Sequence, residues 1–422
     1  MFHSLRRKKE MRRKGAKAAA AILVAASMVL GMAGCGGSSA GSSDSGNAGS
    51  SAGTSSAAGG TESGASGADS GGSSASSETA GDIKLGLSIY STTDATAGPM
   101  VNNMQAACDG MGAELVVATD DQDLEKEITN IENLIANGCQ AVFCLPYSDD
   151  SIPRIAKICE EAEVYFGFYW YDLTNEETHD VCYRSDYFLG NIYEDDVWSA
   201  YTAMKTLSEA GASHIGMFGL PTGRTTTTKR DNGIQKACEE FGMEILVEDR
   251  VNTNTSDDAA SSVESMVSSY SELDGIVIAG MTQTCLPGVI QALQNLGLTD
   301  KVKVSCIDFN ENQTEYFEKG YVNGVIGGHF TGCAWLAVLA VNKLQGTPLT
   351  DEAVSVKDEF LVLQSADDAK NYDAYLYAEL PYTADEYAQM SRKINGEFTY
   401  DDLLEIIASY SVEDVMTRHN AG

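Results

Sequence analysis

The sequence predicts an α/β fold with two doubly wound parallel-sheet lobes joined by a hinge, followed by a C-terminal helical extension. About 340 residues, from about Asp82 to the end, have the composition of a folded body, which is enough for two hydrophobic cores. Within them, short apolar segments alternate with amphipathic segments of about 10–15 residues, as βαβ units require. This alternation restarts near residue 187 with a second set of similar size.

The first set has four expected strands separated by three expected helices. The strands are short apolar runs, at 82–90, 114–119, 141–146 and 164–172. The helices carry apolar residues at helical spacing, at 100–112, 123–138 and 151–162. Gly112 and Gly138 stand where two of these helices are expected to end.

The second set opens with a long segment, 187–211, that has a helical pattern. Strands are then expected at 214–220, 244–251, 274–280, 301–309 and 320–328. Helices are expected at 229–242, 256–270, 287–297 and 333–346, and the last of these is apolar enough to be buried. The tail from about Ser365 is rich in tyrosine and contains an amphipathic helix at 399–410.

The N-terminus has the pattern of an export signal. Eight basic residues lie between Arg6 and Lys17, and a run of about 13 apolar residues follows at 18–30. This run is shorter than the roughly 20 residues that a spanning helix needs, so a secretory signal peptide over 1–34 is expected. A short membrane anchor that stays attached is the alternative interpretation.

Residues 32–35, Met-Ala-Gly-Cys, resemble a bacterial lipobox, although leucine is more usual where Met32 stands. The resemblance implies that Cys35 is acylated and becomes the new N-terminus. Ordinary signal cleavage beside an incidental cysteine is the alternative. The segment 36–80 is almost entirely Gly, Ser, Ala and Thr, so 35–80 is expected to be a lipidated cysteine and a disordered tether of about 35–40 Å r.m.s. span.

Composition excludes several classes of function. The net charge is −33, and removal of a leader with seven net positive charges lowers it to −40. Such an acidic chain does not suit nucleic acid, whose phosphates require Lys and Arg. Of ten cysteines, the nine besides Cys35 form no CxxC pair and no zinc-like cluster. We interpret most of them as buried small hydrophobic residues, leave one disulfide open, and expect no metal and no cofactor.

Six segments, in order, resemble the type I periplasmic sugar-binding family, the ribose- and galactose-binding proteins of ABC importers. They are DIKLGLSIY, AVFCLPYSDD, FYWYD, YRSDYFLG, KRDNG and VKVSCIDFN, and the likeness covers roughly residues 82–346. The resemblance implies discontinuous lobes. The N-terminal lobe would comprise 82–187 plus about 309–346, and the C-terminal lobe 188–308 plus about 347–364, with 365–422 as the helical extension.

The same resemblance implies a ligand site. It places Asp172 at a strand end, Arg230 at a helix start and Asp308 at a second strand end, with Tyr90 in the first loop and His329 near a family glutamine. Aspartates accept from paired sugar hydroxyls, and an arginine fork donates to two oxygens. A single aspartate after a strand is also a common helix cap, and an arginine at a helix start is often a solvated charge.

One position departs from the family pattern. Where the family has Asn-Asp after the strand at 274–280, this chain has residues near Thr282 and Gln283. An amide replaces a carboxylate, so we include Gln283 among the expected ligand-binding residues and leave the identity of the sugar open. The aromatic residues Trp170 and Tyr171 could cover the apolar face of a ring.

The resemblance implies an extracytoplasmic substrate-binding protein, not an enzyme, that is anchored to the cell membrane through Cys35. It would act as a monomer, closing its lobes on a monosaccharide or polyol and delivering it to ABC permease subunits. A sensor that signals to a membrane kinase or chemoreceptor, and a binder of nucleosides or other non-sugar solutes, are the alternatives. The motifs G-x-S-x-G, HExxH and the Walker loop are absent from the expected folded body, residues 82–422, which disfavours a secreted enzyme.

Overall fold

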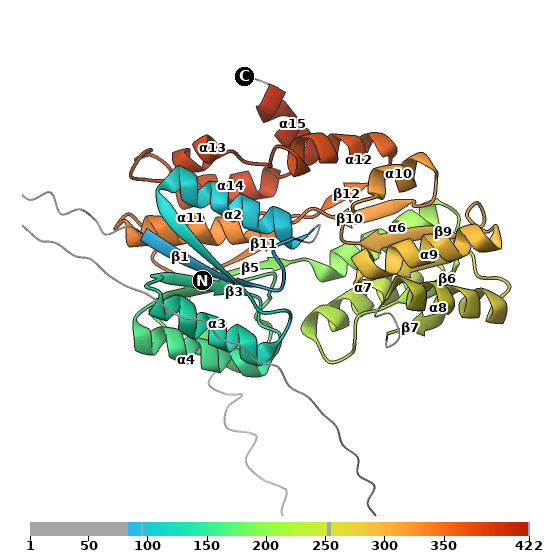
Figure 1. Cartoon of the computed structure of the whole chain (residues 1–422), viewed down its shortest axis with the longest axis horizontal. Coiled ribbons are helices and arrows are strands. Elements are labelled where there is room, and N and C mark those ends of the chain that lie inside the picture. The colour runs from blue at the N-terminus through green and yellow to red at the C-terminus, as the bar shows by residue number, and fades with distance from the viewer. Residues whose placement is uncertain (1–82, 94–95, 251–254, 421–422) are drawn as a thin grey trace, which may run out of the picture. The chain divides into compact units, whose positions relative to one another are not determined.

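The computed structural model describes residues 83–93, 96–250 and 255–420. The expected leader, Cys35 and the tether therefore lie outside the described residues. The chain divides into two units, 1–75 and 76–422, and all described residues belong to the second unit. This unit contains two six-stranded sheets and the helices that cover them (Figure 1).

The sheet of the N-terminal lobe has the strand order β11-β5-β4-β3-β1-β2, and all neighbouring strands are parallel. Its strands are β1 (Ile83–Ile89), β2 (Ala113–Thr119), β3 (Ala141–Cys144), β4 (Tyr165–Tyr169), β5 (Phe188–Glu194) and β11 (Val354–Asp358). Helices on both of its faces make it doubly wound, as predicted. They are α2 (Ala97–Met111), α3 (Leu124–Ala136), α4 (Ile152–Ala162), α5 (Glu176–Tyr183) and α11 (Gly332–Leu344).

The sheet of the C-terminal lobe has the order β12-β10-β9-β8-β6-β7, with only its edge strand β12 antiparallel among the described strands. Its strands are β6 (His214–Phe218), β7 (Glu244–Asp249), β8 (Gly275–Ile278), β9 (Lys303–Ile307), β10 (Gly324–Gly327) and β12 (Leu361–Leu363). Its helices are α6 (Asp196–Glu209), α7 (Thr225–Phe241), α8 (Ser256–Ser269), α9 (Thr282–Leu296) and α10 (Gln313–Glu318).

The expected helix at 187–211 is wrong in its first third. Residues 188–194 form β5, and the helix α6 begins only at Asp196. Pairing with β4 and β11 overrides the local helical pattern, and Gly190 permits this pairing. This glycine has φ +133°, and a Cβ there would lie 2.2 Å from the carbonyl oxygen of Val354 on β11. Only glycine allows so close an approach of two backbones.

The chain passes between the two sheets three times, at 194–196, 327–332 and 358–361. These crossovers differ from the lobe boundaries that the sequence predicts. Strands β5 and β11 pair in the first sheet, although their residues were expected in the C-terminal lobe. Strand β10 pairs with β9 in the second sheet, although it was expected in the N-terminal lobe. For all three strands, pairing with a strand that is distant in the sequence decides to which sheet the strand belongs.

The C-terminal extension is helical, as predicted. It comprises α12 (Ala366–Tyr372), the π-helical turn η2 (Asp373–Tyr377), α13 (Ala384–Gln389), α14 (Tyr400–Ser409) and α15 (Val412–Asn420). All nine cysteines in the described part of the chain are free, and eight of them are buried, as expected for small hydrophobic residues. Among the described helices, none has the length and apolar character needed to cross a membrane.

Candidate functional site

Several strands are followed, at their carboxyl ends, by a residue other than glycine that has a positive φ angle. Trp170 after β4, Met281 after β8 and Asp308 after β9 have φ angles of 53°, 56° and 77°. Positive φ costs a residue with a Cβ on the order of 1–3 kcal/mol, and such strain is concentrated at functional sites. In open α/β sheets ligands bind at this edge. The strained positions therefore point to the carboxyl ends of both sheets.

A buried ionic network lies at the same edge, where the chain crosses between the lobes. The Arg230 guanidinium donates through Nε to Asp196 Oδ1 at 2.8 Å and through Nη1 to the Ala279 carbonyl at 2.9 Å. Its Nη2 lies 3.5 Å from Glu194 Oε2, and the other Glu194 oxygen lies 2.7 Å from His329 Nε2. Arginine and histidine thus share one carboxylate.

Asp308 faces this network from the end of β9. Its carboxylate lies 4.0 Å from Arg230 Nη1 and 3.8 Å from His329 Nε2. The Asp308 side chain is 23% exposed, whereas that of Arg230 is 7% and that of His329 is 1% exposed. Asp308 is therefore the member of the network that can reach solvent or a ligand.

The electrostatics of the network are those of buried, paired charges. Burial alone would lower the pKa of Arg230, but Asp196, Asp308 and Glu194 outweigh it and raise the pKa. Burial would also lower the pKa of His329, but the charge and hydrogen bond of Glu194 raise it. For Glu194 burial acts to raise the pKa, and His329 with Arg230 lowers it overall. The network therefore favours a charged Arg–Glu–His chain.

All three crossovers contribute to this region. The first supplies Glu194 and Asp196, and the second supplies His329. The third begins at Asp358, whose Oδ1 accepts from Thr331 Oγ1 at 3.1 Å, and it includes Phe360, whose ring centroid lies 4.4 Å from that of His329. Burial raises the pKa of Asp358 to about 6. The polar network is thus built into the hinge.

Two side chains of the N-terminal lobe reach beyond the hinge network. Asp172, in the loop after β4, forms an ion pair with Lys229 on α7 of the C-terminal lobe. Trp170 Nε1 donates to the His329 carbonyl at 3.0 Å, and the two ring centroids are 4.6 Å apart. The residues after β4 therefore bridge to the C-terminal lobe and to the second crossover.

The structure brings three of the six expected ligand residues together. Arg230, His329 and Asp308 come together in the hinge network. Asp172 lies at the Lys229 ion pair instead, and Tyr90 follows β1, half-buried against the core.

Gln283 is the sixth expected residue, and it lies in the first turn of α9. Its amide nitrogen donates to the Phe309 carbonyl, and its amide oxygen accepts from Asn310 Nδ2 at 3.4 Å. The Gln283 side chain thus holds the backbone that directly follows Asp308.

Sequence reasoning missed four charged residues of this region, Glu194, Asp196, Lys229 and Asp358. Glu194 and Asp196 were hidden inside the segment expected to be a helix. Lys229 directly precedes Arg230 and could have been selected with it. No motif marked Asp358.

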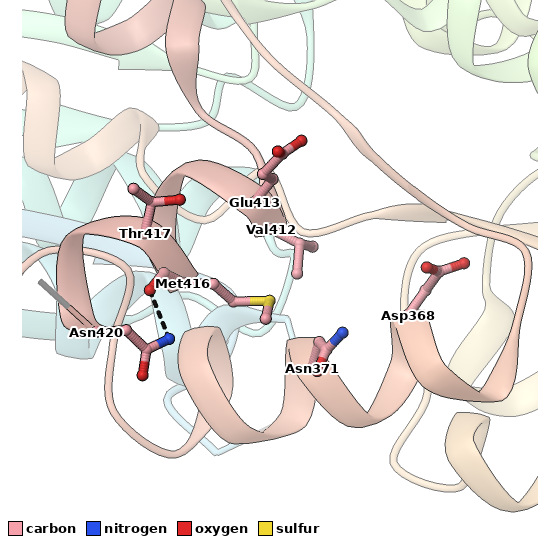
Figure 2. A pocket seen from close by; sticks show the side chains of 7 residues that line it. All are labelled: Asp368, Asn371, Val412, Glu413, Met416, Thr417 and Asn420. Carbon is pink, nitrogen blue, oxygen red and sulfur yellow. Dashed lines mark hydrogen bonds between the residues drawn. The ribbon is translucent and has the colours of Figure 1, made fainter.

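No cluster of three or more His, Cys, Asp and Glu side chains suited to a metal ion occurs among the described residues. A hollow of about 580 Å³ lies elsewhere, between α12 and α15 of the extension (Figure 2). It is lined by Asp368, Asn371, Val412, Glu413, Met416, Thr417 and Asn420. Its lining shares no residue with the hinge network.

The sequence matches the family described as periplasmic binding protein domain over residues 85–348, more than half of the chain. The chain belongs to this family. Its members are substrate-binding transport proteins, and the family indicates an extracytoplasmic location. The match ends before the C-terminal extension begins.

Among individual proteins, the chain is similar to a xylitol-binding protein of Mycolicibacterium smegmatis, with 24% identity over 255 residues. That match covers 59% of this chain and 66% of the relative, slightly less than two thirds of its length. A second similarity is to an ABC transporter solute-binding protein of Actinobacillus succinogenes solved with D-allose. The TM-score is 0.61 at 18% identity, covering 69% of this chain and 100% of that chain.

A solute-binding protein of Bacillus halodurans solved with myo-inositol gives a TM-score of 0.57 at 16% identity, covering 71% of this chain and 99% of that chain. These structural similarities bear out the predicted type I periplasmic-binding-protein fold. The periplasmic binding protein thus has the fold of sugar-binding ABC solute-binding proteins, with an extension that lies outside the family match.

Proposed function

We propose that this protein captures an uncharged polyhydroxylated solute, a sugar or polyol, for an ABC importer, at the carboxyl ends of its two sheets. The observation that carries the proposal is the partly exposed Asp308, strained at a strand end and backed by a buried Arg–Glu–His chain. A carboxylate held in this way accepts from two hydroxyls at once. The named relatives support the class, since one is called xylitol-binding and two were solved with D-allose and myo-inositol.

The charge of the site favours an uncharged ligand. The region contains five acids against Lys229, Arg230 and the charged His329, and all three cations are already paired with carboxylates. The acids are Asp172, Glu194, Asp196, Asp308 and Asp358. An anionic ligand such as a uronic acid would meet uncompensated repulsion here.

The expected ligand residues take different roles in this proposal. Asp172, Asp308, Gln283 and Tyr90 have exposed surface and would contact the solute. Arg230 and His329 are almost wholly buried, and Arg230 Nε and His329 Nε2 are directed at the carboxylates of Asp196 and Glu194. They would therefore position Asp308 and the crossovers.

Membrane attachment through Cys35 is a further part of the proposal. The lipobox-like residues and the Gly/Ser tether support it, and two or more acyl chains would be needed for durable anchoring. Metabolic labelling of the full chain with an alkyne-tagged palmitate should mark the wild type and Cys238→Ser, but not Cys35→Ser. Equal labelling of all three would contradict the anchor.

A thermal-shift screen of residues 36–422 tests the ligand class. Xylitol, D-allose, ribose and myo-inositol would be compared with glucuronate, nucleosides and amino acids. A ligand at 100 times its Kd stabilises the folded state by about 2.7 kcal/mol, which gives a clear shift. A shift with a neutral polyol and none with glucuronate is expected. A shift confined to nucleosides, amino acids or glucuronate would overturn the proposed class.

A further inference from the structure

The C-terminal extension makes contacts on both sides of the hinge. Helix α12 packs on α10 and β12 of the C-terminal lobe, whereas α13 packs on α2 and α14 packs on β11 of the N-terminal lobe. In Figure 1 the extension lies along the top of the view, from α13 near α2 to α12 near α10. We propose that the extension, residues 365–420, is a strap that spans the hinge and limits the separation of the two lobes.

The attachment to the C-terminal lobe combines an aromatic anchor with polar contacts. Tyr372 is 2% exposed, and its ring centroid lies 4.5 Å from that of Phe309, the second residue after β9. The next residue, Asp373, accepts from Thr314 Oγ1 at 2.5 Å. Lys370 pairs with Glu318 at 2.8 Å, but both are half-exposed, so this pair contributes little. Tyr372 and Asp373 therefore form the main attachment.

The attachment to the N-terminal lobe is more extensive. A Cβ on Gly110 of α2 would lie 2.0 Å from the Ala384 carbonyl oxygen of α13, so these two helices are in direct backbone contact. Buried Asn342 on α11 donates to the Met390 carbonyl at 3.0 Å and accepts from the Arg392 N–H at 2.8 Å. The extension should therefore stay with the N-terminal lobe when the lobes move.

A third contact reaches the hinge itself. The buried Tyr410 hydroxyl donates to the Gly328 carbonyl at 2.7 Å, within the crossover from β10 to α11. Gly328 has φ +76° and directly precedes His329 of the ionic network. Opening the hinge changes backbone angles in these few residues. Tyr410 thus restrains one of the crossover segments whose backbone must change when the hinge opens.

The extension has a weak point between its two attachments. The π-helical turn η2 follows Tyr372, and Leu380 has φ +67°. Residues 374–380 are therefore the segment that would stretch or slip when the lobes separate. Most of the extension moves together with the N-terminal lobe. The contacts of the extension with the C-terminal lobe therefore limit how far the two lobes can separate.

Distance measurement between the lobes tests the strap without any ligand. Nitroxide labels would be attached to cysteines introduced at two exposed positions, Glu132→Cys on α3 and Glu264→Cys on α8. The protein used is residues 36–422 with the substitution Cys238→Ser. The eight other cysteines are buried, so the labels should react at the introduced sites. Double electron–electron resonance then reports the distribution of interlobe distances.

Two variants weaken the strap without disturbing the core. Thr314→Val removes the bond to Asp373, and Tyr410→Phe removes the bond to Gly328 but keeps the ring. Loss of one buried hydrogen bond changes a two-state ratio by about two- to tenfold. Both variants should populate longer interlobe distances. The matched controls Thr417→Val and Tyr377→Phe, at exposed positions of the extension, should retain the wild-type distribution.

Circular dichroism melting identifies any variant that has lost its fold. The strap would be overturned if folded Thr314→Val and Tyr410→Phe gave the same interlobe distance distributions as the wild type and the controls. Because no solute is present, this result is independent of the proposed ligand class. Failure of every sugar to bind would leave the strap intact, and failure of the strap would leave sugar binding intact.

Discussion

Glu127 offers a prediction that follows from burial alone. It lies on α3 with 0% of its surface exposed, near the buried Asp120. Burial first, and then the charge of Asp120, raises the pKa of Glu127 from 4.5 to about 8. The folded protein therefore holds Glu127 as a neutral acid at pH 7, whereas the unfolded chain ionises it near pH 4.5. Glu127→Gln keeps the shape and removes this ionisation.

The sign and size of the effect follow from linkage. Between pH 4.5 and 8 the folded state binds one more proton than the unfolded state at this position, so stability falls as pH rises. Each pH unit corresponds to about 1.4 kcal/mol, and the window of about 3.5 units gives an upper limit of about 5 kcal/mol. The difference in unfolding free energy between Glu127→Gln and the wild type should shift in favour of Gln by up to this amount across the window.

Urea unfolding followed by circular dichroism at pH 5.0, 6.5 and 8.0 measures the difference directly. Other titrating groups act in both proteins and cancel. Exposed Glu132 on the same helix supplies the control, since Glu132→Gln should follow the wild-type pH dependence. The reasoning would be refuted if the difference in unfolding free energy between Glu127→Gln and the wild type stayed constant within about 0.5 kcal/mol from pH 5 to 8.

Three further predictions concern the hinge and the strap. His329→Gln should lower stability most below about pH 6.5, and the deficit should shrink as pH rises through the raised pKa of the Glu194-paired histidine. Urea unfolding at pH 5.5 and 9 checks this, and a constant deficit contradicts it. Gly110→Ala should cost about 1–3 kcal/mol through its clash with α13, and wild-type stability would contradict that packing. Lys229→Met should raise the ligand-free radius of gyration in X-ray scattering by releasing Asp172, and an unchanged value would contradict its bridging role.

The sequence predicted most elements because their signals are local. Alternating apolar strands and amphipathic helices, with glycines at helix ends, correctly indicated both sheets. The prediction for 188–194 failed because only the single capping residue Asp195 separates β5 from α6, and because pairing with β11, about 160 positions away, decides the conformation of this segment. The same non-local pairing decides β10 and β11, so the lobe boundaries could not be read from the chain.

In the site, too, the features with a local sequence signal were predicted, and those that depend on distant contacts were not. Asp308 and Arg230 stand in recognisable motifs, and the structure brings them to within 4.0 Å. The burial of Arg230 was not predictable, because its partners Glu194 and Asp196 lie on a crossover that local patterns do not reveal. The extension was recognised as helical, but its attachment to both lobes depends on contacts such as Tyr410 with Gly328, 82 positions apart.

Isothermal titration of residues 36–422 with xylitol, D-allose and myo-inositol tests the central claim most directly. The wild type would be compared with Asp308→Asn and with the exposed control Asp300→Asn. We expect at least one polyol to bind the wild type and the control equally. Asp308→Asn should bind it at least about tenfold more weakly, because hydrogen bonds to a charged group contribute about 1.5–3 kcal/mol. Absence of binding by every neutral polyol, or equal affinity in all three proteins, would contradict the account.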